Sequence, residues 1–340
     1  MKKILTVYTG GTICTQAGEE GRTLAPEIAR RALLTNFSRS GSKYARLCKE
    51  LFEESDIPEG YQTLSENMTL EKLNRIIEHL RSFDMSKYAG VMIMHGTDTL
   101  AFTAAIVSIL FAATPVPVML VSGDRPPADK SSNANANFRA AVELIMSAIA
   151  PNVYVPYRNS DGEIYLHLGS RIMQCANYTQ DFFSAGQALS VSSEELFSKC
   201  TEHSRRREGV NFPIRLCDGI KLLHPYTGLD YSDICLDRTK AVVHSSYHSG
   251  TVCVEEDSHS ILYFAQKCHE RGIPLFVAPC KLGAEQYSSA YKMIKSGLVN
   301  ILDMTTEMAY AKLTVGISYG LAGQKLNNFM FSEINNEFVG

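Results

Sequence analysis

The chain has no surplus of basic residues, since 33 Lys and Arg stand against 36 Asp and Glu, for a formal net charge of -3. A protein that binds a phosphate backbone through counterion release needs an excess of positive charge. We therefore expect no nucleic-acid partner. A composition that is 45% hydrophobic and 20% charged also excludes disordered, collagen-like and disulfide-scaffold classes, and is typical of a soluble globular protein.

A disulfide framework and a secretory leader are both missing. None of the nine cysteines stands in a C-x-x-C pair, and an odd number cannot close into a full set of disulfides. Met1-Lys2-Lys3 passes directly into a strand-like run, without the apolar stretch and cleavage site of a signal peptide. Both features favour a reducing, cytoplasmic location.

The longest uncharged run, Leu100–Gly123, is interrupted before it reaches the length of a membrane span. Pro115 and Pro117 cut it in the middle, because each proline removes a backbone donor and restricts the residue before it. We expect a buried helix at Leu100–Leu110 and a buried strand at Val118–Val121, and no membrane association.

Short apolar runs alternate with longer periodic ones through the first half, which is typical of an α/β fold. Right-handed crossovers would then give a mainly parallel sheet flanked by helices on both faces, with a second, smaller α/β domain after it. The expected strands are Ile4–Tyr8, Val91–Met94, Val118–Val121, Val153–Tyr157 and Ile164–Leu168, and the expected helices are Thr69–Phe83, Leu100–Leu110 and Asn137–Ile149.

A polar, charge-rich stretch that includes Arg205-Arg206-Arg207-Glu208 interrupts this pattern. We expect an N-terminal domain over residues 1–191, a linker over 192–212 and a C-terminal domain over 213–340. The second α/β set comprises the strands Gly219–Leu223, Ala241–His244 and Pro274–Ala278, the helix Ser260–Arg271 and the amphipathic segment Thr305–Ile317.

Two loops follow predicted strands at the place where open parallel sheets bind ligands. The glycines of Thr9-Gly10-Gly11-Thr12 permit either an ordinary turn or a close approach to a ligand. This loop lacks the G-x-G-x-x-G spacing of a dinucleotide site, and we expect no cofactor. Four residues, Cys253, His259, Cys268 and His269, do not follow zinc-site spacings, so no metal site is predicted.

The second loop, His95-Gly96-Thr97-Asp98-Thr99, places a carboxylate between two threonines at a strand-to-helix transition. These residue types either cap the following helix or form part of a site, and His95 is expected to be a packed, hydrogen-bonded histidine. A third element, Leu64-Ser65-Glu66-Asn67-Met68-Thr69, precedes a predicted helix and has the same two interpretations.

Taken together, these motifs resemble the bacterial-type L-asparaginase family, and the carboxyl-terminal ones resemble its cytoplasmic type I branch. The resemblance covers nearly the whole chain. It rests on Thr9-Gly10-Gly11-Thr12-Ile13, Ser65-Glu66-Asn67-Met68, His95-Gly96-Thr97-Asp98-Thr99, Ser122-Gly123-Asp124-Arg125-Pro126, Ile220-Lys221-Leu222-Leu223-His224-Pro225, Ser246-Tyr247-His248-Ser249-Gly250 and Asp303-Met304-Thr305-Thr306-Glu307.

The resemblance implies hydrolysis of a side-chain amide through a threonine nucleophile and a covalent acyl-enzyme. Thr12 would attack the amide carbon, while Thr97 and Asp98 would activate the nucleophile or the water. Ser65 and Glu66 fall where the family holds the α-carboxylate and α-amino groups of a small amino acid. Backbone N–H groups of the two glycine-containing loops are the expected oxyanion donors. A homo-oligomer, dimer or tetramer, is expected from the same resemblance.

Several residues depart from the family pattern. Gln174 or Cys175 occupies the place of a catalytic lysine, and Lys130 is the candidate replacement. The loop before Pro26 has no tyrosine, and Asp124 adds a carboxylate on the leaving-group side. Thr251 stands where the family often has asparagine.

Three functions therefore remain open. The first is an active amidohydrolase with Thr12 as nucleophile. The second is an asparaginase-like protein, catalytically weakened, that binds an amino acid without efficient turnover. The third is an amidotransferase subunit that acts on glutamine or a charged transfer RNA, which is less favoured because such relatives carry an additional amino-terminal domain and this motif begins at Thr9.

Overall fold

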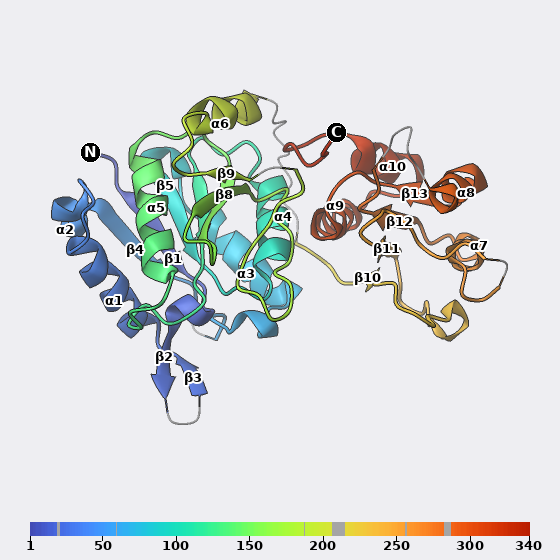
Figure 1. The fold of residues 1–340 in the computed structure, drawn as a ribbon, viewed down its shortest axis with the longest axis horizontal. Coiled ribbons are helices and arrows are strands. Elements are labelled where there is room, and N and C mark those ends of the chain that lie inside the picture. Colours follow the sequence, from blue (N-terminus) through green and yellow to red (C-terminus); the bar gives the residue numbers. More distant parts are fainter. Residues whose placement is uncertain (19–20, 59, 187, 206–214, 256, 282–286) are drawn as a thin grey trace. The chain divides into compact units, whose positions relative to one another are not determined.

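The computed structural model describes the chain except residues 19–20, 59, 187, 206–214, 256 and 282–286 (Figure 1). The chain divides into two compact units, Met1–Asn211 and Phe212–Gly340. The first holds a mainly parallel sheet flanked by helices and the second a smaller parallel sheet, which confirms the predicted fold class. No helix in the described part of the chain combines the length and apolarity that crossing a bilayer requires.

The sheet of the first unit has the strand order β4-β1-β5-β6-β7-β8-β9. Its first five strands run parallel, and β8 and β9 are antiparallel additions at one edge. The central strands are buried on both faces, which explains their unbroken apolar sequences. The strands are β1 (Ile4–Tyr8), β4 (Phe52–Asp56), β5 (Gly90–Met94), β6 (Val118–Val121), β7 (Val153–Arg158), β8 (Ile164–Leu168) and β9 (Leu189–Ser190).

Helices cover both faces of this sheet (Figure 1). Helices α1 (Pro26–Ser38) and α5 (Ala134–Met146) pack together on one face, in a core shared with Met92 and Met119. Helices α3 (Leu70–Arg81) and α4 (Leu100–Leu110) lie on the other. The steps β5–α4–β6 and β6–α5–β7 move in the same direction across the sheet but use opposite faces. Their crossovers therefore have opposite hands, and the expectation of uniformly right-handed crossovers is wrong here.

The sequence predicted no element between β1 and α3, so helix α1 and strand β4 were missed there together with two smaller elements. An antiparallel hairpin, β2 (Thr15–Gly18) and β3 (Gly21–Leu24), projects from the body of the unit, and a short helix, α2 (Cys48–Leu51), precedes β4 (Figure 1). The hairpin is almost wholly exposed, so no apolar alternation marks it in the sequence.

The expected linker over residues 192–212 is partly a helix. Helix α6 (Leu196–Arg205) places Leu196 and Cys200 in the core of the first unit. Residues 206–214 lie outside the described residues. The polar composition concealed this helix, because only one narrow face of it is buried.

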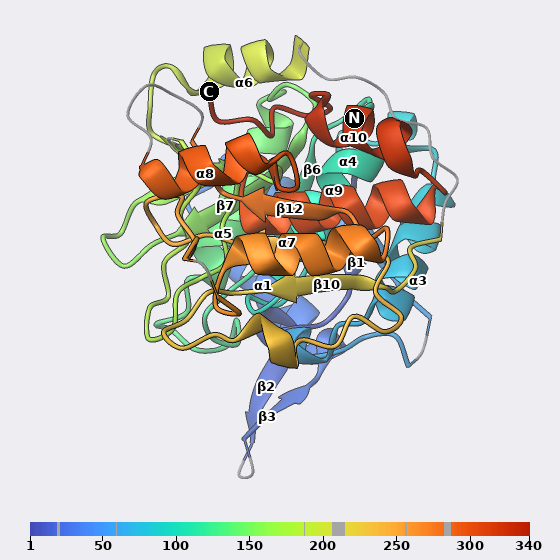
Figure 2. The same ribbon diagram turned by 90° about the vertical axis from the view of Figure 1, so that its right-hand side faces the viewer.

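The second unit contains a four-stranded parallel sheet in the order β10-β11-β12-β13. Helix α9 packs against its first three strands, whereas α7 and α8 belong to the core on the other face (Figure 2). The elements are β10 (Ile220–Leu223), β11 (Ala241–Ser245), β12 (Leu275–Ala278), β13 (Asn300–Ile301), α7 (Ile261–Glu270), α8 (Ser288–Ser296), α9 (Thr306–Ser318) and α10 (Gly323–Phe331).

Helix α9 covers the segment expected at Thr305–Ile317, but it is buried on nearly every side. The expectation that this segment is amphipathic is therefore wrong. Helix α10 packs against it, and Lys312 has no exposed side-chain surface. The Lys312 ammonium lies 2.5 Å from the equally buried carboxylate of Glu337. A charged residue in this helix therefore points to an internal ion pair, and not to a solvent face.

Candidate active site

Three loops of the first unit meet at the carboxyl ends of β1 and β5. Gly11 adopts φ 71°, in the left-handed region, and its N–H donates to the Thr63 carbonyl at 2.8 Å. A Cβ built on Gly11 would stand 2.0 Å from the Cα of Gly96, so the two loops touch backbone to backbone. Only glycine fits here, and the next residues of the two loops, Thr12 and Thr97, therefore start from adjoining backbone.

The third loop joins through Ser65, which lies in a short 3-10 turn. A Cβ on Gly96 would stand 2.4 Å from Ser65 Oγ. Ser65 Oγ donates to Asp98 Oδ2 at 2.9 Å and accepts from the Asp98 N–H at 3.2 Å. The Thr99 hydroxyl donates to the Ser65 carbonyl at 3.0 Å. The three sequence motifs thus form one connected structure.

Burial differs among the five predicted site residues. Ser65 is buried, Thr12 and Thr97 are half-buried, and Asp98 and Glu66 are exposed. The single Ser65 hydroxyl proton is used by Asp98, so Ser65 positions that carboxylate and has no proton left for a substrate carboxylate in this arrangement. The Asp98 N–H is likewise occupied and is not a free oxyanion donor.

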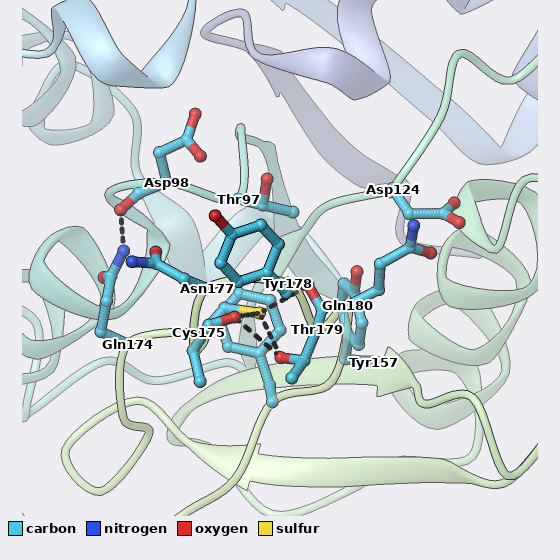
Figure 3. A pocket seen from close by; sticks show the side chains of 12 residues that line it. Thr97, Asp98, Asp124, Tyr157, Gln174, Cys175, Asn177, Tyr178, Thr179 and Gln180 are labelled. Atoms are coloured by element: carbon cyan, nitrogen blue, oxygen red, sulfur yellow. Dashed lines mark hydrogen bonds between the residues drawn. The ribbon is translucent and has the colours of Figure 1, made fainter.

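A cavity of about 270 Å³ opens beside Thr97 and Asp98 (Figure 3). Thr12, Ser65 and Glu66 are not among its lining residues, and Asp98 and most of one wall are exposed. As far as the structure describes this wall, it contains two carboxylates and no lysine or arginine. The lining residues are Thr97, Asp98, Asp124, Tyr157, Gln174, Cys175, Ala176, Asn177, Tyr178, Thr179, Gln180 and Phe182.

Neutral side chains occupy the wall where the resemblance implies a lysine. The Gln174 amide donates to the backbone carbonyl of Asp98 (Figure 3). The Cys175 thiol donates to the Asp181 carbonyl at 3.2 Å, and burial raises the pKa of this thiol. Cys175 is therefore an uncharged group beside Asp98 and not a thiolate nucleophile. Lys130 is exposed and does not line the cavity.

Asp124 is fixed on the opposite wall from Asp98 (Figure 3). Its carboxylate accepts from the Asn133 N–H at 2.9 Å, and its own N–H donates to Asn133 Oδ1 at 2.9 Å. Arg22 of the hairpin donates to the Asp124 carbonyl at 3.1 Å. The hairpin and the cavity wall are thus connected through a charge-assisted contact, which the sequence did not predict.

His95 is fully buried behind the glycine contact. Its Nδ1 donates to the Gly96 carbonyl at 2.8 Å, and burial lowers its pKa to about 4. The ring is therefore neutral at physiological pH. It is a packed, hydrogen-bonded histidine, as predicted.

Most of the wall was not found from the sequence. Asn177, Tyr178, Thr179 and Gln180 come from a polar loop between β8 and β9, and Tyr157 comes from the end of β7. A polar loop has no hydrophobic period, so no sequence signal marked it. Thr251, which stands where the family often has asparagine, lies in the second unit.

The family model for the N-terminal asparaginase domain matches residues 3–196, which is more than half of the chain. Among curated proteins, the chain is 26% identical over 329 residues to a glutamyl-tRNA(Gln) amidotransferase subunit from Aeropyrum pernix. That match covers 92% of this chain and 74% of the relative. The corresponding protein from Metallosphaera sedula is also 26% identical, over 99% of this chain and 76% of the relative.

Solved structures share the fold. L-asparaginase I from Vibrio cholerae superimposes with a TM-score of 0.74 at 23% sequence identity. The thermostable L-asparaginase from Thermococcus kodakarensis gives a TM-score of 0.73 at 20% identity. Each match covers 99% of both chains.

Proposed function

Because this chain belongs to the asparaginase family, we propose that it hydrolyses the side-chain amide of L-asparagine, or of a related small amino-acid amide, to the acid and ammonia. The observation that carries the proposal is the backbone contact between Gly11 and Gly96. It brings the segments that present Thr12 and Thr97 together, and the Ser65 bond holds Asp98 beside them.

The proposed reaction has two steps. The Thr12 hydroxyl attacks the amide carbon, its proton passes through Thr97 and Asp98 to the departing nitrogen, and the C–N bond breaks to release ammonia. Water then attacks the resulting ester, which releases the acid and restores the Thr12 hydroxyl. An unassisted threonine hydroxyl is a poor nucleophile near neutral pH, which is why an adjacent acceptor is needed.

Recognition of the amino acid would use carboxylates. Asp98 and Glu66 are the groups that attract its ammonium, and Ser65 contributes by fixing the Asp98 carboxylate. No cofactor or metal enters this scheme. We propose a small-molecule substrate, a homo-oligomeric assembly and a cytoplasmic location, without a membrane or nucleic-acid partner.

The curated relatives bear on the substrate. They are named as components of a glutamyl-tRNA(Gln) amidotransferase, so glutamine belongs in any substrate panel. The absence of a nucleic-acid partner remains a prediction for this chain.

A second candidate is binding without efficient turnover. Its support is specific: Gln174 and Cys175 are neutral at the wall where the resemblance implies a lysine. Loss of one member of a catalytic unit commonly lowers the rate by several powers of ten.

Ammonia release from asparagine, glutamine and small amides tests the proposal. We expect Thr12→Ala to lower kcat/KM by about 10³-fold or more. Thr201→Ala, at an exposed threonine on helix α6 that does not line the cavity, is the matched control and leaves activity unchanged. Ammonia release no greater than that of Thr12→Ala would contradict hydrolysis. If no ammonia is released, calorimetric binding of aspartate would support a protein that binds without turnover. Turnover that Thr12→Ala abolishes would eliminate that second candidate.

A further inference from the structure

Tyr178 stands at the mouth of the cavity beside Thr97. In the view of Figure 3 its ring is drawn beside Thr97, with its hydroxyl on the side of the cavity that carries Asp98. Tyr178 is fully exposed, so burial does not hold its ring there. It is the aromatic group that the solvent-exposed part of this wall presents to a ligand.

The backbone of Tyr178 is in an unfavourable conformation. Its φ is 63°, in the left-handed region that residues other than glycine and asparagine rarely adopt. The Thr179 N–H donates to the Ala176 carbonyl at 3.2 Å, which makes residues 176–179 a tight turn with Tyr178 in its third place. Glycine or asparagine is favoured at that place when φ is positive. A tyrosine there costs free energy that an exposed ring does not recover.

Hydrogen bonds within the turn and next to it fix its backbone. The Thr179 hydroxyl donates to the Ala176 carbonyl at 2.9 Å, and the Cys175 thiol donates to the Asp181 carbonyl at 3.2 Å. The Asp181 carboxylate in turn accepts from the Ser160 N–H and hydroxyl, both at 2.7 Å. The backbone thus fixes the position from which the Tyr178 side chain extends over the cavity.

We propose that Tyr178 contacts the bound amino-acid amide, with its ring closing the mouth of the cavity and its hydroxyl donating a hydrogen bond to the substrate. The inference rests on the proposed function for the identity of the substrate. Strain kept at an exposed position is typical of functional sites. A phenolic hydroxyl both donates and accepts, and an aromatic face excludes water at a mouth whose other exposed side chains are mostly polar.

Three substitutions separate the ring, the hydroxyl and the backbone strain. We expect Tyr178→Phe to lower kcat about 10- to 100-fold with KM nearly unchanged, and Tyr178→Ala to raise KM as well. Tyr178→Gly relieves the strain, so its thermal midpoint should equal or exceed that of the parent while its kcat/KM falls as far as that of Tyr178→Ala. A tyrosine with only a structural role would not give a glycine variant that keeps its thermal midpoint and loses kcat/KM.

Tyr165 supplies the matched control. It lies on β8, its hydroxyl donates to Asp161 at 3.0 Å, and it does not line the cavity. Tyr165→Phe should leave kcat and KM unchanged. Kinetics of Tyr178→Phe and Tyr178→Ala equal to the parent would overturn the proposal.

A binding measurement keeps the inference independent of turnover. The chain contains no tryptophan, so Tyr178→Trp carries a single fluorophore at the cavity mouth and Tyr165→Trp a single one outside it. We expect aspartate, added as the probe, to change the emission of the first variant and not of the second. Aspartate that binds to Tyr178→Trp by calorimetry without changing its emission would overturn the inference, and so would absence of any aspartate or asparagine binding. A signal change without ammonia release would count against hydrolysis and support the contact.

Discussion

Gly11 and Gly96 come so close that neither tolerates a side chain, since a Cβ on Gly11 would lie 2.0 Å from the Gly96 Cα. Gly11→Ala would combine left-handed strain with this collision. We expect a loss of about 3 kcal/mol or more in the free energy of unfolding, and a fall of at least about 100-fold in kcat/KM as Thr12 is displaced. Urea unfolding and ammonia release measure the two effects.

Gly272→Ala is the control for strain alone. Gly272 has nearly the same φ, 66°, and a Cβ built on it would meet nothing within 4 Å. Its substitution should cost only about 1 kcal/mol. If Gly11→Ala were no less stable than Gly272→Ala, the close contact between the two loops would be disproved.

The Ser65–Asp98 bond gives a second prediction. Ser65→Ala removes the hydroxyl that fixes the carboxylate, and because Asp98 is exposed the stability loss should be only about 1 kcal/mol. The Kd for aspartate should rise about tenfold, measured by calorimetry. Ser131→Ala is the control, since its hydroxyl donates to Asp129 at 2.7 Å outside the cavity. An unchanged Kd for Ser65→Ala would show that the bond does not position Asp98 for binding.

The convergence of these motifs could be predicted, because parallel strands bring their carboxyl ends to one edge of the sheet. Uncharged, largely apolar sequences such as Val91–Met94 and Leu100–Leu110 likewise indicated a buried strand and a buried helix, and both were found. The edge strand Phe52–Asp56 was missed, because its sequence FEESD is mostly polar and exposed. Helix α6 was missed for the same reason.

The cavity wall shows where sequence reasoning ends. The partner that uses the Ser65 proton, and the turn that carries Tyr178 over the cavity, both depend on contacts between segments far apart in the chain. Residue types at these positions are compatible with ordinary caps and loops. Only the fold decides which of them meet.

Buried histidines predict how stability depends on pH. Burial lowers the pKa of His95, His167 and His244 to about 4, whereas in the unfolded chain a histidine titrates near about 6.5. As the pH falls from 6.5 to 4, the unfolded chain binds protons before the folded chain does. The free energy of unfolding therefore falls by up to about 3 kcal/mol per histidine. Above about pH 6.5 this contribution to the pH dependence vanishes.

His167→Gln should therefore flatten the acid side of the profile. The difference in unfolding free energy between pH 7 and pH 4.5 should shrink by about 2 kcal/mol relative to the parent, measured in urea. His269→Gln, an exposed histidine on α7, should leave that difference unchanged. Equal pH dependence of the parent and His167→Gln would mean that His167 is not held neutral by burial.

Introducing a positive charge at position 175, where the resemblance implies a lysine, distinguishes the two candidate functions. If the neutral wall limits turnover, Cys175→Lys supplies an ammonium beside Asp98 and Thr97, and kcat/KM for asparagine should rise at least about tenfold. Gln180→Lys puts the same charge elsewhere on the cavity wall and should give no such gain. A gain shared by both variants would reflect general electrostatic attraction of the substrate. No gain in Cys175→Lys, with aspartate binding intact, would show that the neutral side chain at position 175 is not what limits the reaction.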